Sequence, residues 1–92
     1  KTVMTKTQIK KAINKDVYTY VTERFPEFII DDSEGYGRIY FVDSTSSNPA
    51  DDSIQYHQSR HEVCTLNWAS ERVKDVEHEL ESWINALLKQ YQ

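Results

Sequence analysis

The sequence predicts an α+β fold, in which a small antiparallel sheet of three to four strands is flanked by an N-terminal and a C-terminal helix, in the order α-β-β-β-α. Two observations predict it. Apolar residues recur at helical spacing near both ends of the chain, whereas β-branched and aromatic residues concentrate between them. Both helices are expected to cover the same face of the sheet. The 92 residues are expected to form a single domain, 1–92, in which 1–3 are not native and Met4 is the natural start.

The first helix is expected from about Thr7 to Arg24. Thr5 or Thr7 can cap its first turn with a hydroxyl group. Pro26 ends the helix, because the residue before a proline is disfavoured in helical geometry. The apolar side chains that recur at helical spacing are those of Ile9, Ile13, Val17, Tyr20 and Val21.

Two strands are expected next, at 28–30 and 37–43, because both segments are rich in β-branched and aromatic residues. The segment between them contains Gly35 and Gly37. Glycine adopts a positive φ without steric cost, as a tight hairpin connection requires. The two strands are therefore expected to form a hairpin.

The middle of the chain is harder to assign. Residues 44–52 are expected to form a polar loop that ends in a helix start, with Asn48 as cap and Pro49 at the first helical position. Residues 53–68 allow one bent strand, a hairpin, or a short helix followed by a strand. The β-branched residues near the end of this segment favour mostly strand, with an irregularity near 59–60.

The last helix is expected over 69–91, where an apolar stripe runs for about six turns. Packing inside the domain explains this stripe better than a coiled-coil seam does. Acidic residues near its start and Lys89 near its end match the helix dipole. The stripe comprises Val73, Val76, Leu80, Trp83, Ile84, Leu87, Leu88 and Tyr91.

The stretch HQSRHEVC, residues 57–64, contains two of the three histidines and the one cysteine. Zinc ligands all lie about 2.0–2.3 Å from the ion. In a continuous strand, His57 and His61 share a face but stand about 13 Å apart, and Cys64 points to the opposite face. A strand therefore disfavours a metal site, and Cys64 is expected to be a small buried apolar residue.

A helix would instead place His57, His61 and Cys64 on one face, and Glu62 or His78 could then supply a fourth ligand. The metal interpretation thus depends on helix where the residue types favour strand. Neither a metal nor any other cofactor is expected.

Catalysis is not indicated by any motif. The sequence contains no Gly-x-Ser-x-Gly segment, and its two glycines cannot build a phosphate-binding loop. The adjacent acids Asp31-Asp32 and Asp51-Asp52 are typical of turns and helix caps rather than of an acid–base pair. The protein is therefore expected not to be an enzyme.

The cellular setting follows from the apolar runs and the cysteine content. The longest apolar run, 39–42, is far shorter than the roughly twenty residues that span a membrane. A single cysteine cannot form an intramolecular disulfide, which fits a reducing compartment. A cytoplasmic location is therefore expected, without membrane association.

Charge is distributed unevenly along the chain. Residues 1–24 carry six basic and two acidic side chains, whereas 25–92 carry five basic and thirteen acidic ones. Such an acidic body suits a larger partner protein with a basic surface better than it suits nucleic acid. The acidic turn residues are expected to gather at one end of the sheet.

Tyrosine supports the same interpretation. Ile39 and Phe41 would share one face of their strand and Tyr40 and Val42 the other, which stays uncovered if the helices lie on one side. Tyrosine is enriched at protein interfaces. The residues expected to contact a partner are Asp31, Asp32, Glu34, Tyr36, Tyr40, Asp51 and Asp52.

The sequence thus favours a small acidic non-catalytic protein that binds and modulates a larger partner, of the inhibitor, immunity or phage anti-defence type. One alternative is a nucleic-acid-associated protein that uses the basic first helix. Double-stranded RNA-binding domains share this order of elements, but they need a basic start to the last helix, where this chain has Glu71 and Asp75. Another alternative is a structural subunit of a larger assembly such as a phage particle. The oligomeric state stays open.

Overall fold

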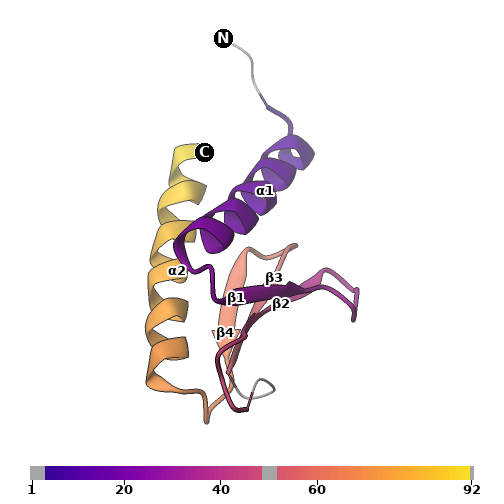
Figure 1. Cartoon of the computed structure of the whole chain (residues 1–92). Coiled ribbons are helices and arrows are strands. Elements are labelled where there is room, and N and C mark those ends of the chain that lie inside the picture. Colours follow the sequence, from indigo (N-terminus) through magenta and orange to yellow (C-terminus); the bar gives the residue numbers. More distant parts are fainter. Residues whose placement is uncertain (1–3, 49–51, 92) are drawn as a thin grey trace.

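The computed structural model describes residues 4–48 and 52–91, and it confirms the predicted α+β fold. Within these residues four strands form one antiparallel sheet, in which each strand pairs with its neighbours in sequence. Both helices lie on one face of the sheet (Figure 1). The elements are α1 (Lys6–Arg24), β1 (Phe28–Asp31), β2 (Arg38–Asp43), β3 (Ser53–His57), β4 (Glu62–Thr65) and α2 (Glu71–Tyr91).

Helix α1 begins at a capping box, in which two backbone amides are satisfied by side chains. The Thr5 hydroxyl accepts a hydrogen bond from the Gln8 amide at 3.2 Å, and Gln8 Oε1 accepts one from the Thr5 amide at 2.9 Å. The helix ends at Arg24, with Phe25 as its C-cap directly before Pro26. The predicted cap and the predicted end are therefore both confirmed.

The β1–β2 hairpin forms as predicted, with Gly35 and Gly37 at φ of 73° and 71°. Tyr36, between them, also has a positive φ of 58°, which is uncommon for a bulky residue. Two backbone hydrogen bonds, from Gly35 to Asp32 O and from Arg38 to Gly35 O, close the turn.

Residues 53–68 contain a second hairpin, so the preference for mostly strand with an irregularity near 59–60 is confirmed, and the hairpin is the alternative that holds. The chain reverses at 58–61, where His61 has a φ of 55° and its amide donates to His57 O at 2.8 Å. Neither glycine nor proline marks this turn, which is why sequence reasoning gave only an irregularity near 59–60. The proposed helix start at Pro49 lies outside the described residues.

Helix α2 begins at Glu71, because the Ser70 hydroxyl accepts a hydrogen bond from the Val73 amide and caps the first turn. Its predicted apolar stripe faces the core. The buried members of the stripe are Val73, Val76, Leu80, Ile84 and Leu87, and Trp83, Leu88 and Tyr91 are partly buried.

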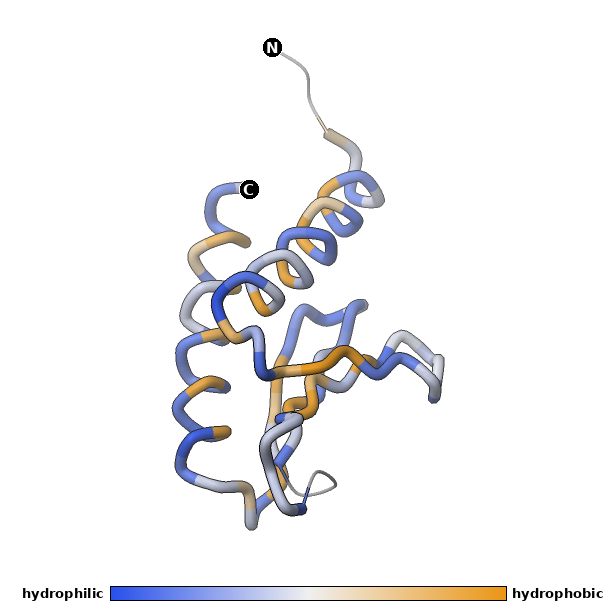
Figure 2. The backbone as a smooth tube through the Cα atoms, in the orientation of Figure 1, coloured by the Kyte–Doolittle hydropathy of each residue, from blue (hydrophilic) through white to orange (hydrophobic). Residues whose placement is uncertain are grey.

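The core lies between the helices and the covered face of the sheet. Figure 2 shows the hydrophobic residues of both helices turned toward the sheet and toward each other. Phe41, Ile54 and Tyr56 of the sheet are at most 1% exposed. The Tyr56 hydroxyl donates to Asn14 Oδ1 at 2.6 Å and lies 2.9 Å from His61 Nδ1, so this buried polar group is satisfied.

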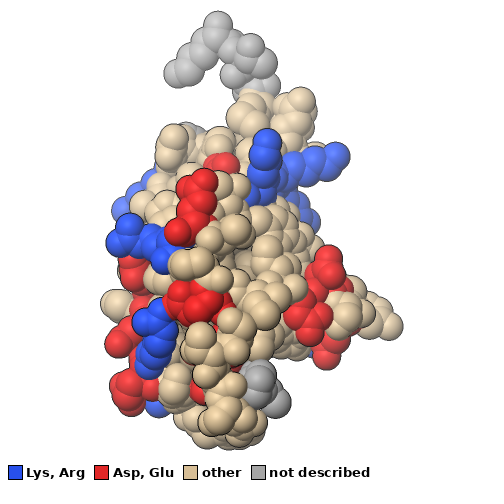
Figure 3. Space-filling view, viewed as in Figure 1, with Lys and Arg blue, Asp and Glu red and all other residues tan. Residues whose placement is uncertain are grey.

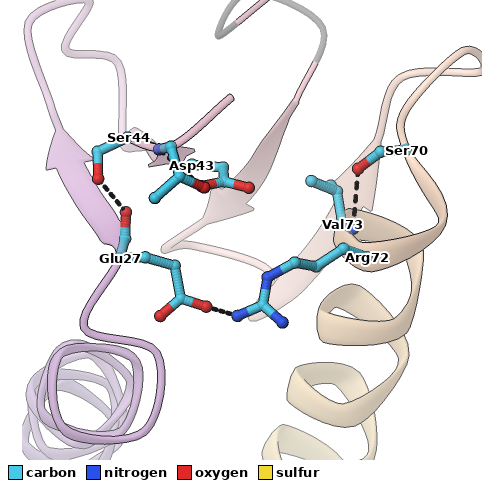
Figure 4. Close-up of polar contacts among 7 residues, drawn as sticks. Glu27, Asp43, Ser44, Ser70, Arg72 and Val73 are labelled. Atoms are coloured by element: carbon cyan, nitrogen blue, oxygen red, sulfur yellow. Dashed lines mark hydrogen bonds and ion pairs between the residues drawn. The ribbon is translucent and has the colours of Figure 1, made fainter. Parts of the chain in front are cut away.

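A polar cluster joins the beginning of β1 to the beginning of α2 (Figure 4). Arg72 forms an ion pair with Glu27, and the backbone carbonyl of Glu27 accepts a hydrogen bond from the Ser44 hydroxyl at 2.7 Å. The Asp43 carboxylate accepts two further bonds from Thr45. The cluster therefore fixes the end of the sheet at which the 44–52 connection lies.

Candidate functional site

The face of the sheet opposite the helices carries a continuous row of side chains across all four strands. Asp31 of β1 pairs with Tyr40 of β2, Tyr40 with Gln55 of β3, and Gln55 with Cys64 of β4. Paired residues in an antiparallel sheet project to the same side. These four side chains therefore lie side by side on what we call the open face.

The open face is hollowed. A cavity of about 360 Å³ lies over this row. Its polar lining includes the carboxylates of Asp31 and Glu34, and Val42 and Leu66 contribute apolar walls. Ile29, which pairs with Val42 on this face, is 57% exposed. The open face thus combines acidic, aromatic and exposed aliphatic groups.

The side chains around the cavity are held by hydrogen bonds. The Tyr40 hydroxyl donates to Glu34 Oε2 at 3.0 Å, and partial burial together with this carboxylate raises the pKa of Tyr40. The Cys64 thiol donates to Gln55 Oε1 at 3.5 Å. The first contact holds Glu34 of the turn against β2, and the second joins β4 to β3 on the open face.

The sequence predicts a buried Cys64, but this residue is exposed on the open face. Partial burial of the thiol group, followed by the Glu77 and Glu62 carboxylates, raises its pKa. The thiol form is therefore favoured over the thiolate, which is the nucleophile.

The tip of the β1–β2 hairpin projects away from the body of the molecule (Figure 1). Tyr36 at this tip is 96% exposed. Hydrogen bonds from the Ser33 side chain and backbone hold the pKa of Asp31 below its ordinary value, so its carboxylate stays ionised. Asp32 is also exposed. The structure therefore brings five of the predicted contact residues together: Asp31, Asp32, Glu34, Tyr36 and Tyr40.

The other predicted acidic turn is not part of this group. The register pairs Phe28 with Asp43 at one end of the β1–β2 pair and Asp31 with Tyr40 at the other. The 32–37 turn and Asp52, whose backbone oxygen accepts a hydrogen bond from the Asp43 amide, therefore lie at opposite ends of the sheet. The expectation of one acidic end is wrong, because consecutive hairpins of a meander alternate between the two ends.

Asp52 has a structural role in this arrangement. Its Oδ1 accepts a hydrogen bond from the Ser70 amide at 2.9 Å, and its Oδ2 accepts one from the Ser46 hydroxyl. These bonds, with Ser46 first, lower its pKa. Asp52 thus ties the 44–52 connection to the beginning of α2, and Asp51 lies outside the described residues.

The second hairpin also separates the histidines. His57 and Cys64 lie on the open face, where His57 pairs with Glu62. His61 sits in the turn and reaches the covered side, where its ring contacts Tyr56. The argument from a continuous strand is therefore wrong about Cys64, since the chain reversal returns it to the side of His57. Within 4–48 and 52–91, no group of three His, Cys, Asp or Glu side chains could hold a metal ion.

Basic side chains gather elsewhere, over α1, whereas acidic ones cover the β1–β2 hairpin (Figure 3). Lys6, Lys10, Lys11 and Lys15 are all exposed. None of the ion pairs found in the described part of the chain includes any of them. This surface is therefore separate from the open face in both position and sign.

Sequence reasoning missed Gln55 and Leu66, which line the cavity of the open face. Each becomes recognisable only when the second hairpin is known, because that hairpin decides which residues of 53–68 face outward. Gln55 carried no signal of its own.

No protein-family model, curated protein or solved structure matches the chain. Among the described residues, no helix is long and apolar enough to cross a membrane.

Proposed function

We propose that the protein is a non-catalytic binding protein whose open face and acidic hairpin contact a larger partner protein with a basic surface. The observation that carries the proposal is the row Asp31, Tyr40, Gln55 and Cys64, which lines a cavity of about 360 Å³ on the face of the sheet opposite α1 and α2. A reducing, cytoplasmic setting suits this use, because the one cysteine is free and exposed.

The chemistry of the open face supports a protein partner. Interfaces combine aromatic and aliphatic side chains at the centre with polar groups around them. Tyr36, Ile29 and Leu66 are exposed here, next to the carboxylates of Asp31 and Glu34. Exposed carboxylates attract a basic surface and speed association. Inhibitors, immunity proteins and phage anti-defence proteins are the types of modulator that this arrangement suits.

Cys64 offers a direct test, because it is the single cysteine and lines the cavity. Wild-type protein is used as bait, the proteins that it retains are purified, and each is then tested against the variant Asp31→Asn with Asp32→Lys. Such a partner is expected to slow N-ethylmaleimide modification of Cys64. Asn at position 31 keeps an acceptor for Ser33, so the variant changes charge with little effect on the turn.

A partner that binds tightly while Cys64 reacts at its free rate would place the interface elsewhere and contradict the proposal. The modification is followed near neutral pH with an excess of reagent, because the raised pKa of the thiol makes the reaction slow.

Nucleic-acid binding through α1 is a second candidate, favoured by the four exposed lysines that take part in none of the ion pairs of the described residues. It predicts that Lys11→Glu with Lys15→Gln abolishes binding to duplex DNA or RNA, whereas the aspartate variant binds normally. A regular oligomer on sedimentation would instead favour a structural subunit.

A further inference from the structure

A second cavity lies on the covered side, between the helices. Helices α1 and α2 diverge toward the end at which α1 begins and α2 ends (Figure 1). A cavity of about 430 Å³ opens there, within the size range of small-molecule sites. Its apolar walls are formed by Ile9 and Ile13 of α1 and by Leu88 and Tyr91 of α2.

The apolar walls are recessed rather than raised. Ile13 is completely buried, and Ile9, Leu88 and Tyr91 are partly buried against the core. An occupant must therefore be thin. A volume of about 430 Å³ is too small for a partner helix, about 10–12 Å across with its side chains, whereas it accommodates a single hydrocarbon chain.

The rim of the cavity favours a negative charge for three separate reasons. Lys6 and Lys10 both line it, and they are neighbours on one face of α1 because they are four residues apart. Neither forms an ion pair with the described residues. The first turn of α1 also contains no acidic residue, so the positive end of the helix dipole is not compensated there.

Other polar groups near the cavity already have partners within the protein. The Tyr91 hydroxyl donates to Asp16 Oδ2 at 3.0 Å, and His61 Nδ1 lies 2.9 Å from the Tyr56 hydroxyl. Burial, followed by the charge of Lys10, lowers the pKa of His61 and keeps its ring neutral. The apolar walls therefore favour a ligand with an alkyl chain, and the lysines favour a negatively charged head group on that ligand.

We propose that this cavity binds a fatty-acid anion, with its acyl chain between α1 and α2 and its carboxylate at Lys6 and Lys10. The site is independent of the open face, on the opposite side of the sheet. Charge-assisted hydrogen bonds from two ammonium groups hold the carboxylate, and burial of the chain supplies the hydrophobic contribution.

The probe is sodium dodecanoate below its micelle-forming concentration, titrated into the 92-residue protein by calorimetry. One binding site per chain is expected, together with a higher melting temperature. Lys6→Glu with Lys10→Glu is expected to weaken binding by about tenfold or more, because two charge-assisted contacts are lost. The matched control, Lys11→Glu with Lys15→Glu, makes the same charge change on the same helix but away from the cavity.

A third variant tests the walls without changing charge. Ile9→Trp is expected to fill the cavity and to reduce dodecanoate binding, with an unchanged circular dichroism spectrum. Dodecyltrimethylammonium, which has the same chain and the opposite charge, is expected not to bind.

Several outcomes would overturn the proposal. These are the absence of dodecanoate binding, equal weakening by the two lysine pairs, and equal binding of the cationic probe. A dimer that Ile9→Trp dissociates would also overturn it, because a second copy of the chain would then fill the cavity.

Discussion

The ring of Tyr20 in α1 stacks on the ring of Trp83 in α2, with centroids 4.2 Å apart and an interplanar angle of 9°. The same region contains an ionic contact, because Arg24 Nε donates to Glu79 Oε1 at 2.7 Å. The Tyr20 hydroxyl donates to the same carboxylate oxygen at 3.4 Å. The two helices are therefore joined by a specific aromatic and polar contact near the end of α1, while they diverge at its beginning.

This stack predicts a measurable coupling between the two rings. In a double-mutant cycle of Tyr20→Leu and Trp83→Leu, the coupling free energy is expected to be about 0.5–1.5 kcal/mol, as for other aromatic pairs. Urea unfolding of the four proteins gives the value. Purely additive effects would show that the two rings contribute to stability independently.

Leu80 should be a sensitive position of α2, because it is completely buried. Leu80→Ala is expected to lower the free energy of unfolding by about 2–5 kcal/mol, through lost burial and a residual cavity. The control is Glu81→Ala, an exposed site that is expected to change stability by less than about 0.5 kcal/mol. Similar losses in both variants would contradict the assigned face of α2.

Glu79 is unsuitable as a neutral control, although the sequence places it on the polar side of the helix. It accepts hydrogen bonds from Arg24 and Tyr20. An exposed ion pair of this kind contributes about 0.2–1 kcal/mol. Helical periodicity shows which side of α2 is apolar, but it cannot show that a residue at the edge of the polar side touches α1.

The difference between local sequence preference and tertiary contact explains which parts of the molecule could be predicted from the sequence. The ends of α1 and the first hairpin were marked by residues with strong local preferences, namely Thr5, Pro26, Gly35 and Gly37. The second hairpin depends on His61 adopting a positive φ, supported by its contact with Tyr56. That contact is tertiary, and no local preference indicates it. The row that defines the open face could not be predicted without this turn.

The lowered pKa of His61 predicts that the stability of the protein depends on pH. Burial and Lys10 lower its pKa in the folded protein below the ordinary value of 6.5. Between these two pKa values the unfolded chain binds more protons than the folded one. The free energy of unfolding is therefore expected to fall as pH drops from about 6.5 through the lower folded-state pKa.

The variant His61→Asn removes this contribution and tolerates the positive φ at this position. Urea unfolding at pH 7.5 and at pH 5.0 is expected to show a smaller difference for the variant than for wild type. The carboxylates of Asp31 and Asp52 also have lowered pKa values. Their contribution to stability is lost only below about their ordinary pKa of 3.8, which is outside this window. An identical difference in both proteins would exclude His61 as the source.

Metal content is a further prediction. His57 and Cys64 share the open face, but His61 is on the covered side, so the three cannot reach one ion about 2.0–2.3 Å from each. Purified protein is expected to contain no stoichiometric zinc by elemental analysis. Added zinc is also expected to leave the melting temperature unchanged, whereas about one zinc per chain would require a different arrangement of the second hairpin.

The charge of the β1–β2 hairpin should control association with the proposed partner. Asp31→Asn with Asp32→Lys removes negative charge from an exposed turn, so the circular dichroism spectrum is expected to stay unchanged. Binding is expected to weaken mainly through slower association, because exposed charges steer encounter. In wild type the association rate should fall with added salt, which screens charge over about 8 Å at physiological ionic strength.

The matched control for this prediction is Asp75→Asn with Glu81→Lys, which makes the same change in net charge on the exposed side of α2. If the position of the charge matters, this control associates at nearly the wild-type rate. Equal slowing in both variants would show that the partner responds only to net charge, and the open face would lose its assignment. Binding of wild type to duplex DNA or RNA that is lost in Lys11→Glu with Lys15→Gln and kept in the hairpin variant would favour α1 and the nucleic-acid alternative instead. Association rates of these proteins with the partner and with a nucleic-acid duplex, at two salt concentrations, therefore separate the two functions.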